Sequence, residues 1–332
     1  MNTIRTLLAV AVSKSWPLFR LDVDNAFLHG QLDEEVYMSL PPGFYKNEKA
    51  QGKVCRLLKS LYGLKQAPRQ WYSRFSDALV KFGFVQSLND HSLFTYNKDG
   101  IFLALLVYVD DEILTSTSPH LIQSVKTYIH DLFRIKDLGQ LRYFLRFEVA
   151  RSSEGLFLNQ RKYVLELKTE AGLLACKPSN ILMDTKHKLG LSTTPSLDDP
   201  SPYRRLVGQL IYLINTRSDS AYSVHILSQF MNQPTTDHLT AAYKVLRYLK
   251  LTPAQGLFYP SHQPLQLEAH CDADWGACPL TRKSIIGYSV TLGQALISWK
   301  SKSSLLSLDP LPRLNTGRWL TPVVRWLGWS DC

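Results

Sequence analysis

Two adjacent carboxylates follow a long apolar segment near the middle of the chain. Asp110 and Asp111 come directly after the run Phe102–Val109, and apolar residues resume at Ile113. An apolar run interrupted in this way predicts a buried strand, a turn and a second strand. Neighbouring carboxylates repel each other and lose hydration unless a cation neutralises them, and Mg²⁺ suits such a pair. The alternative is that both aspartates decorate a solvated hairpin turn.

A third acid, Asp22, lies on a segment that alternates between apolar and polar residues. Residues 19–24 place Arg20, Asp22 and Asp24 on one face, which is typical of a half-buried strand. Asp24 and Asn25 have an alternative role as caps of the short segment that follows. A strand that carries Asp22 beside the hairpin would bring three carboxylates to two metal ions. Two such ions, about 3.5–4 Å apart, activate a primer 3′-hydroxyl and stabilise the departing pyrophosphate.

Several elements must position these acids. Leu7–Val12 predicts a short buried helix that leads into the next strand. Pro41–Gly43 marks a loop, and Pro68 opens an amphipathic helix that Gly83 closes. The Pro- and Asp-rich segment 193–202 is predicted to be a linker. The periodicity beyond it predicts three helices and then three strands, at 203–216, 221–232, 237–250, 267–272, 284–292 and 295–300.

The charge of the chain favours a polyanionic partner. The 332 residues carry a formal net charge of +10, and Lys and Arg release condensed counterions when they meet phosphates. A basic protein without a nucleic-acid role is the alternative. Lys244, Arg247 and Lys250 share one helix face, which either follows a duplex backbone or is simply solvated.

The five cysteines form no C-x-x-C pair, so neither a disulfide framework nor a zinc knuckle is predicted. His270, Cys271 and Cys278 lack a fourth partner at metal spacing. This pattern indicates a reducing compartment. No stretch reaches the roughly 18 uninterrupted apolar residues of a membrane span, so no membrane partner is expected.

Three motifs give the chain a specific resemblance. LDVDNAFLHGQLDEEVYMSLPPGF, CRLLKSLYGLKQAPRQWYSRF and LLVYVDD resemble the motifs of copia-type retrotransposon reverse transcriptases. DLGQLRYFL, QRKYVLEL and YRRLVGQLIYL continue the similarity, which runs in order from residue 1 to about 302. The resemblance implies a right-hand polymerase palm, with Asp22, Asp110 and Asp111 as ligands of two Mg²⁺ ions that Mn²⁺ can replace. It also implies an RNA or DNA template-primer and deoxynucleoside triphosphates as partners.

The resemblance also assigns a nucleotide pocket. Phe27 matches the aromatic residue that stacks under the incoming sugar and excludes a 2′-hydroxyl; from its position alone it is equally a core phenylalanine. Tyr62 and Gly63 match the segment that lines the nucleotide and template pocket, where glycine allows close backbone approach. Lys65 and Arg69 are expected to face phosphates or solvent.

The C-terminal part resembles a ribonuclease H domain that is cut short. AHCDADWGACPLTRKSIIGYSVTLGQALISWKSK matches its first three strands, with Asp272 as the first metal-binding acid and Asp274 as the alternative. The glutamate segment expected after Lys302 is absent, which suggests a frameshift or altered splicing, so ribonuclease H activity is predicted to be absent. The basic fingers region that the family has ahead of Met1 is also missing.

Two further residues depart from the family pattern. Glu112 stands where the family has an apolar residue and is expected to add a fourth acid beside the metals, on the strand face of Asp110. Arg146 replaces a usual glycine and is expected either to strain a turn or to point outward.

These observations predict an α+β chain with a palm built on an antiparallel sheet, a helical thumb and connection, and a partial ribonuclease H-like fold. The expected divisions are the palm with partial fingers (1–140), a thumb-like region (141–192), the linker (193–202), a helical connection (203–264), the incomplete ribonuclease H-like domain (265–302) and an aberrant, disordered tail (303–332). The expected function is RNA-directed DNA polymerase of a copia-type retrotransposon; the alternative is an inactive remnant that at most binds nucleic acid. The resemblance places it inside the cell, in cytoplasmic virus-like particles or the nucleus.

Overall fold

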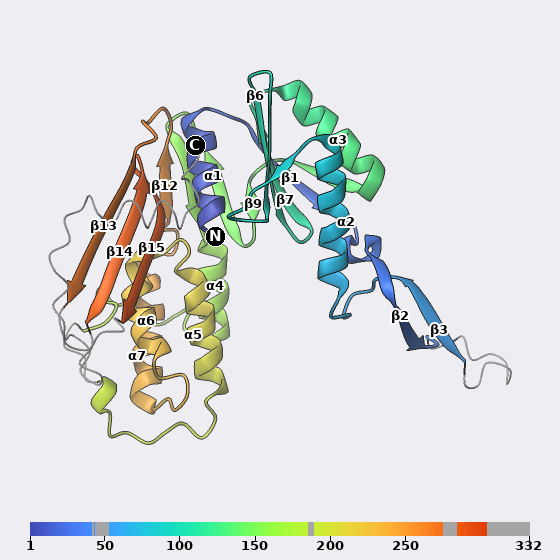
Figure 1. The fold of residues 1–332 in the computed structure, drawn as a ribbon. Coiled ribbons are helices and arrows are strands. Elements are labelled where there is room, and N and C mark those ends of the chain that lie inside the picture. Colours follow the sequence, from blue (N-terminus) through green and yellow to red (C-terminus); the bar gives the residue numbers. More distant parts are fainter. Residues whose placement is uncertain (42, 44–52, 185–188, 275–283, 304–332) are drawn as a thin grey trace. The chain divides into compact units, whose positions relative to one another are not determined.

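The computed structural model of the chain describes residues 1–41, 43, 53–184, 189–274 and 284–303. The expected tail (303–332), except for its first residue, lies outside these ranges, as do Pro42 and Cys278. The described residues form two compact units, one of residues 16–141 and the other of residues 1–15 together with the chain from residue 142 onward. Both mix helices with antiparallel sheets, in keeping with the α+β prediction (Figure 1).

The unit of residues 16–141 is built on a six-stranded sheet in the order β4-β5-β6-β7-β1-β8, in which every neighbouring pair is antiparallel. A separate two-stranded ribbon pairs β2 with β3. The elements are β1 (Leu18–Val23), the 3₁₀ helix η1 (Ala26–His29), β2 (Gln31–Ser39), β3 (Val54–Lys59), α2 (Ala67–Phe82), β4 (Val85–Gln86), β5 (Leu93–Lys98), β6 (Ile101–Tyr108), β7 (Asp111–Ser116), α3 (Pro119–Phe133) and β8 (Ile135–Gln140).

Helices α2 and α3 pack on one face of this sheet. Their apolar stripes share a buried core with β1, β6 and β7, in which Trp71, Phe75 and Phe133 meet as an aromatic cluster. The predicted ends of α2 are confirmed within a residue: Pro68 lies in its first turn, and Gly83 ends it with a φ of +112°. The predicted strand–turn–strand around Asp110 is also confirmed, as the β6–β7 hairpin.

The other unit combines a helical core with two sheets. Helices α4 to α7 bury one apolar cluster, while β12-β11-β10-β9 and β13-β14-β15 form antiparallel sheets. The elements are α1 (Asn2–Ser13), β9 (Tyr143–Phe144), β10 (Phe147–Arg151), β11 (Gly155–Asn159), α4 (Arg161–Glu170), η3 (Leu189–Leu191), α5 (Ser201–Leu213), η4 (Ser218–Ser220), α6 (Ala221–Ser228), α7 (Thr236–Leu249), β12 (Leu257–Pro260), β13 (Leu267–Asp274), β14 (Ile285–Leu292) and β15 (Ala295–Ser303).

The first helix belongs to this second unit, whereas the strand that follows it in sequence belongs to the unit of residues 16–141. α1 packs against β11, β12 and β15, Ser13 donates a hydrogen bond to the Gln263 carbonyl at 2.7 Å, and the Arg5 guanidinium lies 4.0 Å from the centre of the Trp299 ring. The compact units therefore differ from the expected domain 1–140. The reason is that the apolar residues of α1 are buried against strands more than 140 residues away, a pairing that local periodicity does not reveal.

The expected linker 193–202 lies within the second unit. Its backbone forms an isolated bridge from Ser196 to Thr235, and the Leu197 amide donates to the Pro234 carbonyl at 2.9 Å. The segment thus connects elements of one unit. Proline and aspartate suit an irregular backbone of this kind whether or not it separates domains.

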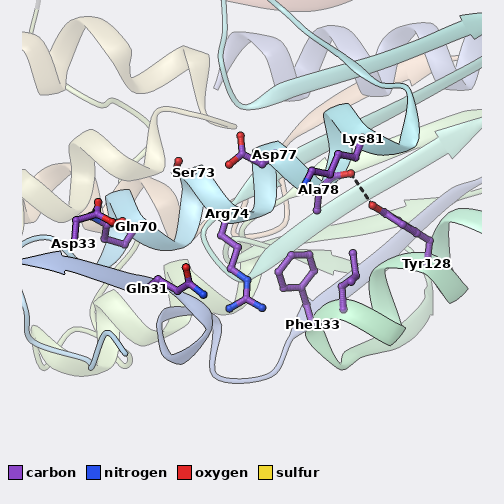
Figure 2. A pocket seen from close by; sticks show the side chains of 11 residues that line it. Gln31, Asp33, Gln70, Ser73, Arg74, Asp77, Ala78, Lys81, Tyr128 and Phe133 are labelled. Carbon is purple, nitrogen blue, oxygen red and sulfur yellow. Dashed lines mark hydrogen bonds between the residues drawn. The ribbon is translucent and has the colours of Figure 1, made fainter. Parts of the chain in front are cut away.

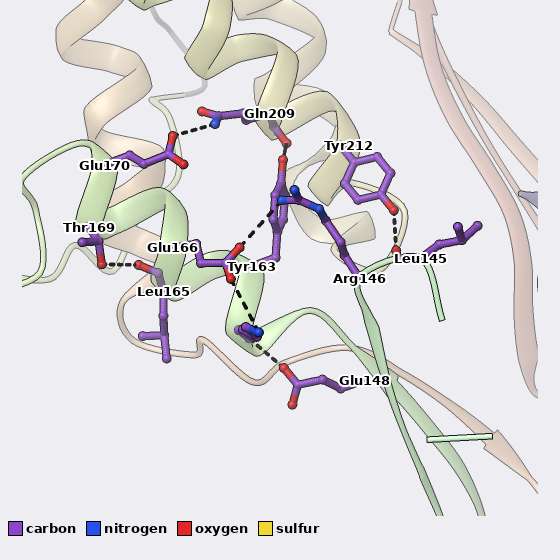
Figure 3. Close-up of polar contacts among 11 residues, drawn as sticks. Leu145, Arg146, Glu148, Tyr163, Leu165, Glu166, Thr169, Glu170, Gln209 and Tyr212 are labelled. Carbon is purple, nitrogen blue, oxygen red and sulfur yellow. Dashed lines mark hydrogen bonds and ion pairs between the residues drawn. The ribbon is translucent and has the colours of Figure 1, made fainter. Parts of the chain in front are cut away.

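Arg146 lies in a two-residue turn with an unfavourable backbone conformation, in agreement with the expectation that it strains a turn. Leu145 and Arg146 join β9 to β10 with φ values of +46° and +62°, a conformation that side chains with a Cβ adopt only at a cost. The Arg146 side chain is exposed, reaches to within 3.7 Å of Glu166 and lies over the Tyr163 ring (Figure 3). The Tyr212 hydroxyl donates to the Leu145 carbonyl and fixes the turn from the other side.

Candidate active site

The three aspartates that are far apart in sequence lie together at the end of the β6–β7 hairpin. Strand β1 pairs with β7 so that Asp22 is directly opposite Asp111. Directly opposed residues in an antiparallel pair project from the same face, so these two side chains share one side of the sheet. Asp110 occupies the turn, and its carbonyl accepts a hydrogen bond from the Val23 amide at 2.8 Å. The register of β1 therefore brings Asp22 to both aspartates of the hairpin.

The turn that carries Asp110 is strained and held from two sides. Val109 has a φ of +60°, which is unfavourable for a β-branched residue. Its carbonyl accepts a hydrogen bond from the indole nitrogen of Trp71 at 2.7 Å, and Trp71 is only 1% exposed. Helix α2 thus fixes one side of the turn and strand β1 the other. The conformation is imposed by these partners, since valine itself disfavours it.

Negative charge is concentrated at this end of the sheet. Burial raises the pKa of Asp22, and the nearby Asp111 and Asp110 carboxylates raise it further. A cation would relieve this repulsion. One is already present: the Arg20 guanidinium donates to Asp111 Oδ1 from Nε at 2.8 Å and lies 2.6 Å from it through NH2.

The donor set suits a hard divalent ion, since carboxylate oxygens are the ligands that Mg²⁺ prefers. Backbone register gives the three aspartates a shared location. In the part of the chain that the structure describes, however, no three His, Cys, Asp or Glu side chains are arranged as a group that could hold a metal ion. The Arg20 guanidinium occupies Asp111 Oδ1, an oxygen that a metal ion could otherwise bind. The three carboxylates fit Mg²⁺ by their chemistry and by the backbone register that brings them to one end of the sheet.

Glu112 lies near the three aspartates, as expected, since their charges help to raise its pKa, but its side chain is buried in the core. Its backbone is opposite Leu21 and Val107, its side chain is 1% exposed, and both carboxyl oxygens lack a hydrogen-bond partner. Asp110 lies in the turn, outside either strand, so alternation along β7 does not relate the two residues. Burial raises the pKa of Glu112 well above its usual range, and the negative charge of Asp111 adds to the effect.

The residues expected to line a nucleotide pocket come together near the aspartates. The Phe27 ring in η1 packs against the Tyr62 ring with centroids 4.8 Å apart. Burial raises the pKa of Tyr62, and the nearby charges of Asp110 and Asp22 raise it further. Tyr62 is 56% exposed, so its ring offers an open surface to a ligand.

The glycine beside Tyr62 has a backbone conformation that favours glycine, whatever approaches it. Gly63 has a φ of +93°, and a Cβ placed there would meet no atom of the described chain within 4 Å. Backbone conformation, and not close approach within the protein, therefore selects glycine. Lys65, on the connection to α2, and Arg69, in the first turn of that helix, are both exposed.

The two residues considered as caps do not act as caps. Asn25 precedes η1 in a left-handed conformation and makes no side-chain capping bond, and Asp24 instead forms an ion pair with Lys136 of the neighbouring strand β8. Asp24 is thus an acid close to the site that has its own counter-charge. Asp272, the acid expected to mark the ribonuclease H-like part, is exposed on β13 opposite Gly287.

Comparison with known proteins decides the family. The Reverse transcriptase (RNA-dependent DNA polymerase) family matches residues 1–185. The chain belongs to the reverse transcriptase family. It is 44% identical over 301 residues to the retrovirus-related Pol polyprotein from transposon RE1 of Arabidopsis thaliana, and 45% identical over 301 residues to that from transposon RE2. Similarity to the Pol polyprotein from transposon TNT 1-94 of Nicotiana tabacum is 35% over 312 residues.

These matches confirm the resemblance to copia-type Pol polyproteins, since each covers 91% of the chain. The chain spans only 20%, 21% and 23% of those relatives. As a reverse transcriptase domain, it belongs to a class that acts on nucleic acid and nucleotides with divalent metal ions. Among the described residues, no helix has the length and apolarity to cross a bilayer.

Sequence reasoning missed two residues of this reverse transcriptase site. Trp71 was expected only as part of the apolar stripe of α2, although a buried tryptophan usually finds an acceptor for its N–H, and that rule points to a second role. Arg20 was placed on the face of Asp22 but was not recognised as the partner of Asp111. The available signal was that Arg20 shares a strand face with Asp22, which places a cation beside any acid that pairs with Asp22.

A cavity of about 460 Å³ in the same unit lies away from the aspartates (Figure 2). α2, α3 and the start of β2 line it, and none of the three aspartates does. Its Arg74 donates to the His29 carbonyl at 2.6 Å, and its Tyr128 hydroxyl donates to the Ala78 carbonyl at 3.0 Å. These bonds join α2 to η1 and α3, so the cavity is part of the support for the site.

Proposed function

We propose that this chain catalyses RNA-directed DNA synthesis: the 3′-oxygen of a primer attacks the α-phosphate of a deoxynucleoside triphosphate, and pyrophosphate leaves. The single observation that carries the proposal is the pairing of Asp22 with Asp111 beside the turn that holds Asp110. In this proposal the six-stranded sheet is the palm, within residues 1–140. Residues 141–192 serve as the thumb, 203–264 as the connection, and 265–302 as a ribonuclease H-like part.

Asp22, Asp110 and Asp111 would hold two Mg²⁺ ions, or Mn²⁺ in their place, which would activate the primer hydroxyl and stabilise the leaving group. The protein itself contributes position and charge. Phe27 lies under the sugar of the incoming nucleotide, where its ring, packed on Tyr62, leaves little room for a 2′-hydroxyl. Lys65, exposed on the connection that leads to α2, faces the triphosphate. Such positioning and electrostatic stabilisation are most of what phosphoryl transfer requires.

The experiment is primer extension on poly(rA)/oligo(dT) with Mg²⁺. Asp110→Asn and Asp22→Asn should each reduce incorporation at least about 100-fold, because each removes a carboxylate that would hold the divalent ions, and these ions would stabilise the negative charge of the reacting phosphate. Asp24→Asn is the matched control: it neutralises an acid two residues from Asp22 that is already paired with Lys136, and incorporation should persist. Equal incorporation by the wild type and Asp110→Asn would refute the proposed catalytic site.

A second candidate is a chain that binds nucleic acid without copying it. The observation that favours it is the Arg20 guanidinium on Asp111, together with the lack of a three-acid metal group among the described residues. Binding of template-primer by the wild type, with no incorporation in either Mg²⁺ or Mn²⁺, would establish this candidate instead.

We also expect no ribonuclease H activity. Asp272 is exposed on β13, and the sequence after Lys302 contains no glutamate to complete a two-metal site. Hybrid-RNA cleavage that disappears on Asp272→Asn would contradict this expectation.

A further inference from the structure

A basic cavity of about 390 Å³ lies in the unit of residues 1–15 and 142–303, on helix α7. One wall is α7 and the other is the segment that follows α4. The residues that line it are Lys177, Pro178, Ser179, Thr240, Tyr243, Lys244 and Arg247. The cavity therefore gathers three cations, an aromatic ring and two hydroxyl-bearing side chains in a volume within the range of small-molecule sites.

Hydrogen bonds fix the two walls relative to each other. The Ser179 amide donates to the Arg247 carbonyl at 3.2 Å, and the Lys250 ammonium donates to the Cys176 carbonyl at 2.7 Å. Lys250 was expected to share with Lys244 and Arg247 a helix face that either follows a duplex backbone or is solvated. It instead holds the opposite wall, and Lys177, which local periodicity could not associate with α7, supplies the third cation of the cavity.

The three cations, Lys177, Lys244 and Arg247, form no ion pair in the described part of the chain. None of the lining residues is acidic. Other basic residues of the same unit are paired, such as Arg217 with Asp219 at 2.8 Å. Three like charges around one cavity repel each other, and a ligand that carries several negative charges relieves this repulsion.

We propose that this cavity binds the phosphodiester backbone of nucleic acid. The proposal rests on the proposed function, in which nucleic acid is the substrate. Arg247 and the two lysines would neutralise neighbouring phosphates, and Tyr243 would supply a flat surface beside them. The contacts proposed are to phosphates, which position a nucleic acid but carry no sequence information directly, so binding at this cavity is expected to depend little on sequence.

The test is fluorescence anisotropy of a labelled RNA–DNA hybrid titrated with the full chain at a series of NaCl concentrations. The variant Lys177→Gln/Lys244→Gln/Arg247→Gln removes all three cations. Each phosphate contact contributes about 0.9 to the slope of log K against log salt, so the slope should become shallower by up to about 2.7. At about 0.1 M salt the affinity should fall at least tenfold.

The matched control is Arg142→Gln/Arg161→Gln/Arg205→Gln. It removes the same charge from exposed positions of the same unit that do not line the cavity. Its slope should change by less than one third of the change in the cavity variant. Equal slopes for the wild type and the cavity variant, or equal losses for the two triple variants, would overturn the proposal.

Two further arms separate the alternatives. Titration with dATP in place of the hybrid tests for a site that takes only free nucleotides. If the triple cavity variant loses affinity for dATP but keeps its affinity for the hybrid, the proposal is overturned. Because anisotropy requires no turnover, a wild-type chain that binds in a cavity-dependent way but incorporates no nucleotide would refute the polymerase assignment alone. Lys177→Gln, in an exposed segment, provides a single variant if the triple variant fails to fold.

Discussion

Replacement of Glu112 by leucine should stabilise the six-stranded unit. The glutamate is 1% exposed among apolar residues, and neither carboxyl oxygen has a hydrogen-bond partner. Glu112→Gln is the matched control, because it keeps the shape and the unsatisfied polar atoms but cannot ionise. Relative to glutamine, leucine removes an orphaned polar group worth about 1–3 kcal/mol and adds buried apolar surface worth about 1–2 kcal/mol. The unfolding free energy of the leucine variant should therefore exceed that of the glutamine variant by about 2–5 kcal/mol at every pH.

The wild type differs from both variants through its proton. Its folded-state pKa is raised above the unfolded value of about 4.3, so the folded state retains a proton that the unfolded state releases. Below the unfolded pKa both states are protonated and this term is zero. As pH rises above it, the unfolding free energy of the wild type should fall by up to about 1.4 kcal/mol per pH unit relative to Glu112→Gln, until the folded pKa is reached.

Urea unfolding between pH 4 and 8 measures both effects. Hydrogen exchange of the β6 and β7 amides assigns the transition to the unit that contains Glu112. Parallel curves for the wild type and Glu112→Gln over this range would refute the raised pKa. A leucine variant no more stable than the glutamine variant would show that the carboxyl is satisfied in solution, and the reasoning about its burial would fail.

Four other substitutions test the site and its support. Arg20→Gln removes the guanidinium that competes for Asp111 and should tighten Mn²⁺ binding several-fold in isothermal titration, whereas weaker binding would mean that Arg20 helps to hold the acids. In urea unfolding, Arg146→Gly should be about 1 kcal/mol more stable than Arg146→Ala. Both variants lose the Glu166 contact, but only glycine adopts a φ of +62° without strain. Equal unfolding free energies would argue against strain at this turn. Trp71→Phe should lower kcat at least about tenfold with a smaller effect on the nucleotide KM, because it removes the N–H that fixes the Val109 carbonyl. Val109→Gly should raise the unfolding free energy by about 1 kcal/mol, because glycine adopts the positive φ without strain. An unchanged kcat for Trp71→Phe together with a less stable Val109→Gly would show that valine itself sets the turn.

Local patterns in the sequence predicted local structure well. The alternation around Asp22, the apolar run before Asp110 and the helix between Pro68 and Gly83 each correspond to an element of the fold. These signals depend on residues within a few positions of one another. The packing of α1 on β12 and β15, the Trp71 bond to Val109 and the third cation at Lys177 depend on contacts between distant segments, and no local period encodes them. For Asp22 and Asp111, the family motifs supplied the long-range information that periodicity lacks.

The register of β1 against β7 links the core to the site. Leu21 and Val23 belong to the buried core, while Asp22 between them is opposite Asp111. A slip of one residue would turn Asp22 toward the core and expose both apolar neighbours, so hydrophobic burial alone selects the register that assembles the acids. Glu112 weakens this selection, because it places an acid at a core position of β7. The alternation that buries Leu21 and Val23 on one face therefore brings Asp22 and Asp111 together on the other. Glu112 breaks this alternation, so it costs stability and adds no carboxylate on the face of Asp22 and Asp111.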